Sequence, residues 1–204
     1  PARIRQVQLA DVLEAIATEG PDVYYKGDVA RAIVDDMGDN AGILTERDFT
    51  EYEPFVLDGV EFPYGGTIVR VPPYACAGVT TAMTLKMLDK LGLRSIDHNS
   101  GEMLHAYISC ARLSFADRFH YMADPAQVDV PWNGLVSDEY IKRRLAGVGE
   151  MVPIWGEAGD PWVEEGRRPE EQHPASIPQW ETGTTHLCTM DDQGNAVSLT
   201  NTLG

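Results

Sequence analysis

Hydroxyl, thiol and imidazole side chains recur at regular spacing near the C-terminal end of the chain, in residues 183–203. Two β-rich runs flank Asp-Asp-Gln-Gly-Asn at 191–195. A three-residue loop, residues 192–194, predicts a hairpin whose type I turn places Gly194 in the left-handed region. Counting outward from the closing pair Asp191 and Asn195 gives the predicted pairs: Cys188 with Ser198, His186 with Thr200, and Thr184 with Thr202.

Alternation along the two strands predicts one small, polar face. Its members are Thr184, His186, Cys188, Ser198, Thr200 and Thr202. Directly opposed residues have Cβ atoms about 4.5–5.5 Å apart, so the hydroxyls of Thr184 and Thr202 should meet. Val197, Leu199 and Leu203 are expected to point the other way, into a core. A purely structural hairpin explains the same pattern, and a slip of one residue would turn one strand over.

Three other groups could do chemistry. Cys76, flanked by small residues, could be a nucleophile, but no local pattern selects its partner among His98, His105, His120, His173 and His186. His120 and Asp124, four residues apart near a helix end, could bind a metal, although a solvated helix end explains them as well and no metal site is predicted. His186 follows Thr184 on the same face by two residues, which favours a hydrogen-bonding or packing role over that of a general base.

Composition excludes several classes of function. The 204 residues include 16 Lys+Arg and 32 Asp+Glu, giving a formal net charge of −16. This balance disfavours binding to nucleic acid or to anionic membranes. No apolar run reaches the roughly 20 residues of a membrane span, and no signal-peptide-like segment follows Pro1, so a soluble protein is expected. The three cysteines are far apart, which predicts neither a disulfide framework nor a zinc motif.

Apolar periodicity and caps predict the elements that must position these residues. The expected helices are 7–18, 28–37, a short one opened by a capping box at 45–48, 79–91, a long one from Ser100 to before Pro125, and one from Ser137 to about Gly147; the expected strands are 55–57 and 67–71. The long helix is apolar almost all round, so it should be largely buried, with Asp117 and Arg118 near its end in structural ion pairing. Residues 150–182 hold five of the 13 prolines and eight acidic residues, which predicts a linker rather than a core segment.

Several segments, in order, resemble one enzyme family. They are Thr184-Thr185-His186 followed by 192–203, and upstream 20–27, 42–49, 115–125 and 128–131. The first resembles the start of the small subunit of γ-glutamyltransferases (γ-glutamyltranspeptidases, glutathione hydrolases), and the others resemble their large subunit. These enzymes are N-terminal-nucleophile hydrolases with αββα layering. The resemblance implies an α+β fold class, with this chain a fragment of that fold, mostly helical and ending in a β-hairpin with the nucleophile.

The resemblance also implies a mechanism and a division of the chain. Residues 1–149 would belong to the large subunit, 150–183 would be an acidic linker, and 184–204 would begin the small subunit. A proenzyme would cut itself between Gly183 and Thr184, and the freed α-amine, with a pKa of about 8, could accept the proton of the Thr184 hydroxyl. Thr184 would then form an acyl-enzyme that water or an amine resolves. In the family a second threonine hydrogen-bonds the nucleophile, and its position here is Thr202.

The implied partners are a small amide such as a γ-glutamyl compound (glutathione, for example), an acceptor amine or water, and the rest of the enzyme's own two subunits, with no cofactor. Two positions depart from the family pattern: Gly204 stands where Asn contacts the γ-glutamyl group, and 72–78 replaces a Pro-Pro-Pro-Ser-Ser-Gly-Gly loop. An acylase of the same fold acting on a non-glutamyl amide is therefore an alternative. A noncatalytic helical binding or assembly module is another. The substrate-binding residues are not identified, and family analogy favours the periplasm or secretion while leaving the cytoplasm open.

Overall fold

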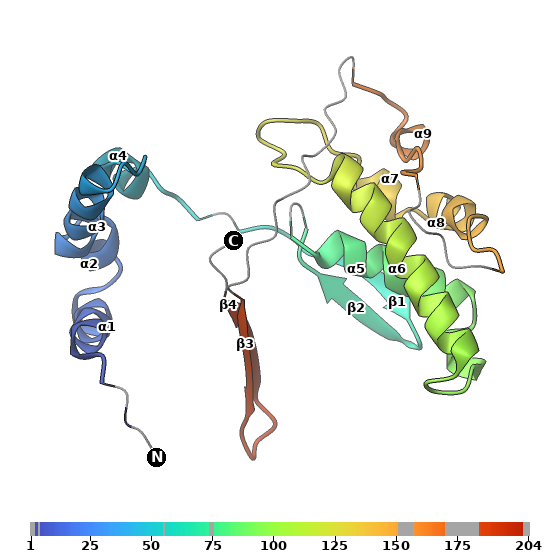
Figure 1. Cartoon of the computed structure of the whole chain (residues 1–204), viewed down its shortest axis with the longest axis horizontal. Helices are drawn as coiled ribbons and strands as arrows, with labels where there is room; N and C mark the ends of the chain where they lie inside the picture. The colour runs from blue at the N-terminus through green and yellow to red at the C-terminus, as the bar shows by residue number, and fades with distance from the viewer. Residues whose placement is uncertain are drawn as a thin grey trace. The chain divides into compact units, whose positions relative to one another are not determined.

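The computed structural model describes residues 3, 5–54, 56–73, 76–150, 157–169 and 184–201 (Figure 1). The chain divides into two units, Pro1–Val56 and Leu57–Gly204. Within the described residues, none of the helices combines the length and the apolar character needed to cross a bilayer.

The first unit consists of short helices. They are α1 (Val7–Glu19), α2 (Asp22–Tyr25), α3 (Asp28–Asp39) and α4 (Glu46–Thr50). The predicted helices 7–18 and 28–37 are confirmed, each with an end shifted by one or two residues. The predicted capping box also forms, with the backbone N–H of Thr45 donating to Asp48 Oδ2 over 2.7 Å. The side chains of Thr45 and Asp48 therefore together fix the start of α4.

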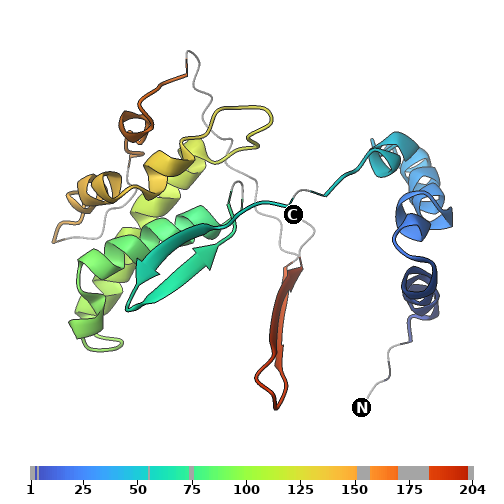
Figure 2. The same cartoon turned by 180° about the vertical axis from the view of Figure 1, so that it is seen from behind.

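The second unit opens with an antiparallel hairpin of β1 (Val60–Tyr64) and β2 (Thr67–Val71). The predicted strand at 55–57 is wrong, because Val56 and Leu57 belong to no strand and Phe55 lies outside the described residues. Gly65 and Gly66 have φ of 61° and 86°, which is the left-handed pair that a two-residue hairpin turn needs. β1 therefore ends at Tyr64, directly before this turn. β1 and β2 lie alongside α5 in both views (Figure 1 and Figure 2).

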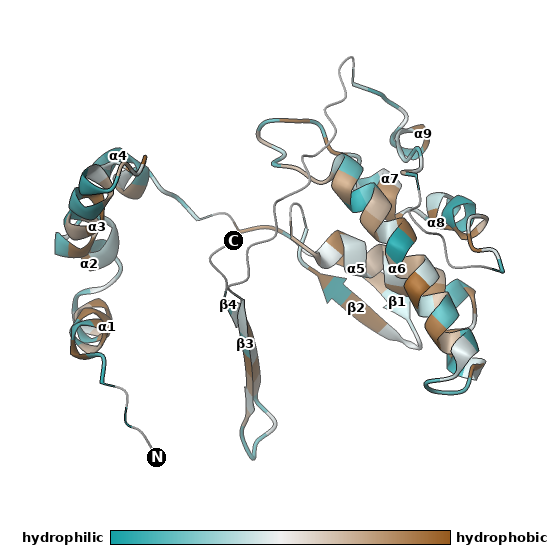
Figure 3. Ribbon diagram, viewed as in Figure 1, coloured by the Kyte–Doolittle hydropathy of each residue, from teal (hydrophilic) through white to brown (hydrophobic). Residues whose placement is uncertain are grey.

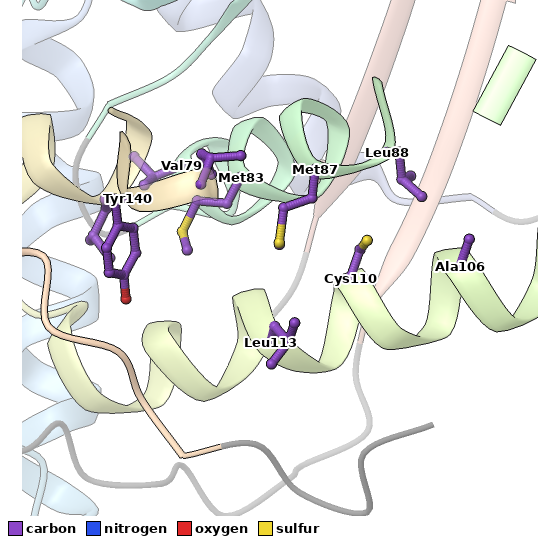
Figure 4. Packing of buried hydrophobic residues seen from close by; sticks show 10 residues of the cluster. Val79, Met83, Met87, Leu88, Ala106, Cys110, Leu113 and Tyr140 are labelled. Carbon is purple, nitrogen blue, oxygen red and sulfur yellow. The ribbon is translucent and has the colours of Figure 1, made fainter. Parts of the chain in front are cut away.

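Helices form the core of the second unit. They are α5 (Gly78–Lys90), α6 (Gly101–Tyr121), α7 (Trp132–Val136) and α8 (Asp138–Leu145), with the 3-10 turn η1 (Leu93–Ser95) between the first two. Figure 4 shows the core between α5 and α6, where Met87 of α5 faces Cys110 and Leu113 of α6. The predicted caps are confirmed: the Ser100 hydroxyl accepts from the Met103 N–H (3.1 Å) and the Ser137 hydroxyl from the Tyr140 N–H (3.2 Å).

Among the described residues, only one side of α6 is buried, which corrects the prediction of a largely buried helix. Ala106, Cys110 and Leu113 face the core, whereas Leu104, Ile108 and Phe115 are 40–44% exposed. Figure 3 shows hydrophobic and hydrophilic residues interspersed along the helix. Apolar character on several sides of a helix therefore does not mean that this chain covers all of them.

Part of the predicted linker belongs to the folded unit. Residues 157–169 include α9 (Trp162–Glu165), and Trp162 is only 3% exposed. α9 packs against α7, where a Cβ on Gly134 would lie 2.2 Å from the Pro161 carbonyl oxygen. Proline content and acidity suggested an extended segment, but one buried tryptophan and this close backbone approach hold it in place. Residues 151–156 and 170–183 of the predicted linker lie outside the described residues.

Candidate active site

The hairpin near the end of the chain has the predicted turn and register. Its strands are β3 (Thr185–Met190) and β4 (Ala196–Asn201). The Asp191 N–H donates to the Asn195 carbonyl (3.0 Å), and Gly194 has a φ of 84°. The Asp191 carboxylate also accepts from the Asn195 side chain over 2.6 Å, and this hydrogen bond lowers the pKa of Asp191. The predicted pairs His186–Thr200 and Cys188–Ser198 are confirmed.

His186 is the centre of a hydrogen-bonded cluster on the polar face of the hairpin. Its Nδ1 lies 2.7 Å from Thr200 Oγ1 across the strands. Its Nε2 lies 3.1 Å from Cys188 Sγ and 3.3 Å from Ser198 Oγ. Both ring nitrogens are thus engaged within the hairpin, which confirms the predicted hydrogen-bonding role. The spacing of these residues in the sequence did not indicate that the His186 ring contacts side chains of both strands.

Thr184 directly precedes β3 and is exposed. Gly183, Thr202, Leu203 and Gly204 lie outside the described residues, so the pairing of Thr184 with Thr202 stays a prediction. The observed register supports it, because the position opposite Thr184 is reached by continuing two residues beyond the pair His186–Thr200. Alternation then places Thr184 on the same face as the His186 cluster.

The opposite face of the hairpin is apolar but not buried by the described residues. Leu187, Val197 and Leu199 are 47–56% exposed. The prediction that Val197 and Leu199 point into a core is therefore not met within the described ranges, and Leu203 lies outside them. In the part of the chain that is described, β3 and β4 form a two-stranded sheet with no third strand at either edge.

Two other candidate residues, Cys76 and His120, are held in structural contacts. The Cys76 thiol lies 2.8 Å from the Pro73 carbonyl, to which it donates, and the ring of His120 packs edge-on against Tyr121. His173, one of the histidines considered for Cys76, is outside the described residues. No group of three or more His, Cys, Asp or Glu side chains is placed to hold a metal within the residues that the structure describes.

The predicted structural ion pairing at the end of α6 is confirmed for Asp117. Its side chain is fully buried, and Arg144 Nε of α8 lies 3.0 Å from Asp117 Oδ2. Burial raises the pKa of Asp117, and the charge of Arg144 opposes that rise. Arg118 instead donates to the Cys76 carbonyl and to the Thr80 hydroxyl, both over 3.3 Å. Nothing in the local sequence identifies Arg144 as the partner, since 26 residues lie between it and Asp117.

Comparison with known proteins places this geometry in context. The family model described as gamma-glutamyltranspeptidase matches residues 2–204. The glutathione hydrolase proenzyme of Bacillus subtilis (strain 168) is 34% identical over 201 residues, which cover 97% of this chain and 34% of that protein. The acylase ACY 1 proenzyme of Pseudomonas sp. (strain SE83) is 31% identical over 209 residues, covering 98% and 33%.

A solved structure agrees with the fold. The gamma-glutamyltranspeptidase from Pseudomonas nitroreducens complexed with L-DON matches with a TM-score of 0.69 and 26% identity, over 74% of this chain and 46% of that chain. The chain spans about a third of the length of the curated relatives that it matches. The residues in common therefore account for part of each relative, and the family-model match at 2–204 includes the hairpin.

Proposed function

Because this chain belongs to the gamma-glutamyltranspeptidase family, we propose that it is part of a proenzyme that cuts its own Gly183–Thr184 bond and then uses Thr184 to cleave amides. The observation that supports this most directly is the register of the β3–β4 hairpin, whose last described pair is Thr185–Asn201; the same register extended by one residue would place Thr202 opposite Thr184 on the polar face. The names of the relatives, glutathione hydrolase proenzyme and acylase proenzyme, also describe proteins that are made as precursors.

Autocleavage would proceed by attack of the Thr184 hydroxyl on the Gly183 carbonyl carbon. The peptide C–N bond breaks as an ester C–O bond forms, and water then hydrolyses the ester to leave a carboxylate on Gly183 and a free α-amine on Thr184. That amine, with a pKa of about 8, is the nearest base for the Thr184 hydroxyl in later turnovers. The hydroxyl attacks a substrate amide, an amine leaves, and the acyl group passes to water or to an acceptor amine.

The substrate class is a γ-glutamyl amide such as glutathione. A second candidate, an amide whose acyl group is not glutamyl, is favoured by two sequence features: Gly204, where the family pattern has Asn, and the divergent loop at 72–78. The similarity to an acylase proenzyme supports the same alternative. Both candidates use the same Thr184 chemistry and differ only in recognition of the acyl group.

Cleavage is tested on the full-length protein that contains this chain, by incubation and sequencing of new N-termini. We expect a chain beginning with Thr184, and we expect none from Thr184→Ala. Thr185→Ala is the matched control, because Thr185 is a neighbouring threonine whose position alternates to the other face. Cleavage that persists in Thr184→Ala and stops in Thr185→Ala would refute the assignment, and a wild-type protein that never cleaves would favour a noncatalytic assembly module.

Acyl specificity is tested with a matched pair of p-nitroanilides, γ-glutamyl and glutaryl, which differ only in the α-amino group. Faster turnover of the γ-glutamyl compound supports a glutathione hydrolase-like enzyme. Faster turnover of the glutaryl compound supports the acylase alternative.

A further inference from the structure

A short segment upstream of the proposed cleavage site, residues 157–168 (the anchor segment), is attached to the helical core. Its attachment centres on the backbone of Gly159. The Gly159 N–H donates to Asp117 Oδ1 over 2.8 Å, and the Gly159 carbonyl accepts from the Tyr121 hydroxyl over 2.6 Å. Both partners belong to α6, so two turns of one helix hold both polar groups of one residue.

Further contacts bind the anchor segment to α7 and α8. The Gly134 N–H of α7 donates to Glu165 Oε1 over 2.8 Å. Arg143 of α8 donates to the Asp160 carbonyl over 3.1 Å and forms an ion pair with Glu164. The anchor segment is thus fixed by hydrogen bonds to three helices, each joining a backbone group to a side chain, and by the buried ring of Trp162.

The contact between Asp117 and the anchor segment stabilises both partners. A fully buried carboxylate is costly unless its oxygens are paired. Here one oxygen accepts from the anchor segment and the other lies beside Arg144, whose side chain is 11% exposed. The fit is close, because a Cβ on residue 159 would lie 2.4 Å from the Tyr140 hydroxyl and 2.8 Å from Arg144 Cδ.

We propose that Asp117 is a positioning residue for autocleavage, which holds the anchor segment so that the chain leaves the folded core at a fixed point ahead of the Gly183–Thr184 bond. This inference rests on the proposed function. Fifteen residues, 169–183, separate the anchor segment from Thr184. Without it, the last fixed helix would be α8, which ends at Leu145, and the separation would grow to 38 residues, 146–183. Attack requires atoms to approach within about 3–3.5 Å, and a misplacement of about 1 Å can cost about 100-fold in rate.

Two variants of the full-length proenzyme release the anchor segment in different ways. The double variant Asp117→Ala with Arg144→Met removes both buried charges together, because removing only one would leave the other unpaired. Gly159→Ala keeps both charges and displaces the segment sterically. Met87→Ala is the matched control: it weakens the same core from the α5 side, where Met87 faces Cys110, without touching the anchor segment (Figure 4).

Two measurements are made on each variant. The first is hydrogen exchange of residues 157–168 in a Thr184→Ala background, which cannot cleave. We expect faster exchange in both anchor variants and unchanged exchange in Met87→Ala. The second is the rate at which chains beginning with Thr184 appear, at a temperature where circular dichroism shows each variant folded. We expect both anchor variants to cleave about tenfold more slowly or worse, and Met87→Ala to cleave at the wild-type rate.

The outcomes separate the two hypotheses. Wild-type cleavage rates in anchor variants whose segment exchanges rapidly would overturn the positioning role and leave the proposed function intact. Unchanged exchange in both anchor variants would overturn the role of Asp117 as the holding group. Equal slowing by Met87→Ala would show that general stability is responsible, and a wild-type protein that never yields a Thr184 chain would overturn the proposed function and the positioning role together.

Discussion

The His186–Thr200 contact gives the sharpest test of the candidate site. The pair joins β3 to β4 on the polar face, and its 2.7 Å separation is that of a good hydrogen bond. Thr200→Val removes the hydroxyl and keeps the shape of the side chain. His186→Ala removes the same contact together with those to Cys188 and Ser198. The two substitutions therefore share one interaction that a double-mutant cycle can isolate.

The expected magnitude follows from the geometry. A neutral hydrogen bond between side chains contributes about 0.5–1.5 kcal/mol net, and 1 kcal/mol corresponds to about a fivefold change in rate. Thr200→Val should slow autocleavage about fivefold. His186→Ala should slow it by at least as much, and the double variant should be no slower than His186→Ala alone, because the shared contact can be lost only once.

The assay is the rate of appearance of chains beginning with Thr184 in the full-length proenzyme, measured for all four members of the cycle. Thr189→Val is the control, since Thr189 alternates to the opposite face of the hairpin and pairs with Val197. In the double variant with His186→Ala, the effect of Thr189→Val on the cleavage rate should multiply that of His186→Ala. If the effects of His186→Ala and Thr200→Val on the cleavage rate also multiply in the double variant, the two side chains act independently. That result would refute a role for the His186–Thr200 hydrogen bond in cleavage.

Four further outcomes are expected. Gly194→Ala should slow cleavage about fivefold, because a residue with a β-carbon is destabilised by about 1 kcal/mol at a left-handed φ of 84°. Gly194→Asn should cleave at close to the wild-type rate. Equal rates in the two variants would contradict the turn assignment. Thr202→Ala should slow cleavage with the fold intact, as judged by circular dichroism, and unchanged cleavage would contradict the opposed-threonine register. Ser100→Ala should lower the free energy of unfolding of the second unit by about 1 kcal/mol in urea titrations, and Ser100→Asp should not; equal losses would show that the cap to Met103 is not what stabilises α6. Burial raises the pKa of Cys110 from 9.0 to about 11. The stability that its neutral thiol contributes is therefore complete below pH 9 and is lost as the pH rises through about 11. At pH 8, iodoacetamide should modify Cys110 only after denaturation, and modification of the native protein would contradict its burial.

Local signals in the sequence predicted the caps and the hairpin correctly. Ser100 and Ser137 start helices because one side-chain oxygen satisfies a free backbone N–H within three residues. The register of β3 and β4 follows from the turn at Gly194, because each pair is counted outward from it. These features depend on neighbours in the chain, so the sequence alone contains the necessary information.

Features that depend on distant partners were missed or wrong. Trp162 is buried in α9, which packs against α7, yet its proline- and acid-rich surroundings suggested a linker. Asp117 was expected to be paired, but neither Arg144 nor the Gly159 N–H could be identified as a partner before the helices were packed. The exposed side of α6 was missed for the same reason, since periodicity shows which residues are apolar and not what covers them.

The β3–β4 hairpin has a consequence for the order in which the protein folds. Its turn and cross-strand pairs join residues at most 16 positions apart, from Thr185 to Asn201, and isolated hairpins form in about 1–10 μs. A lone two-stranded hairpin is nevertheless marginally stable, so its lasting stability must come from later, long-range packing. Register is thus chosen early and locally, and stability is supplied late by the rest of the protein. Residues 185–201 should accordingly be exchangeable between relatives as one cassette without loss of strand alignment.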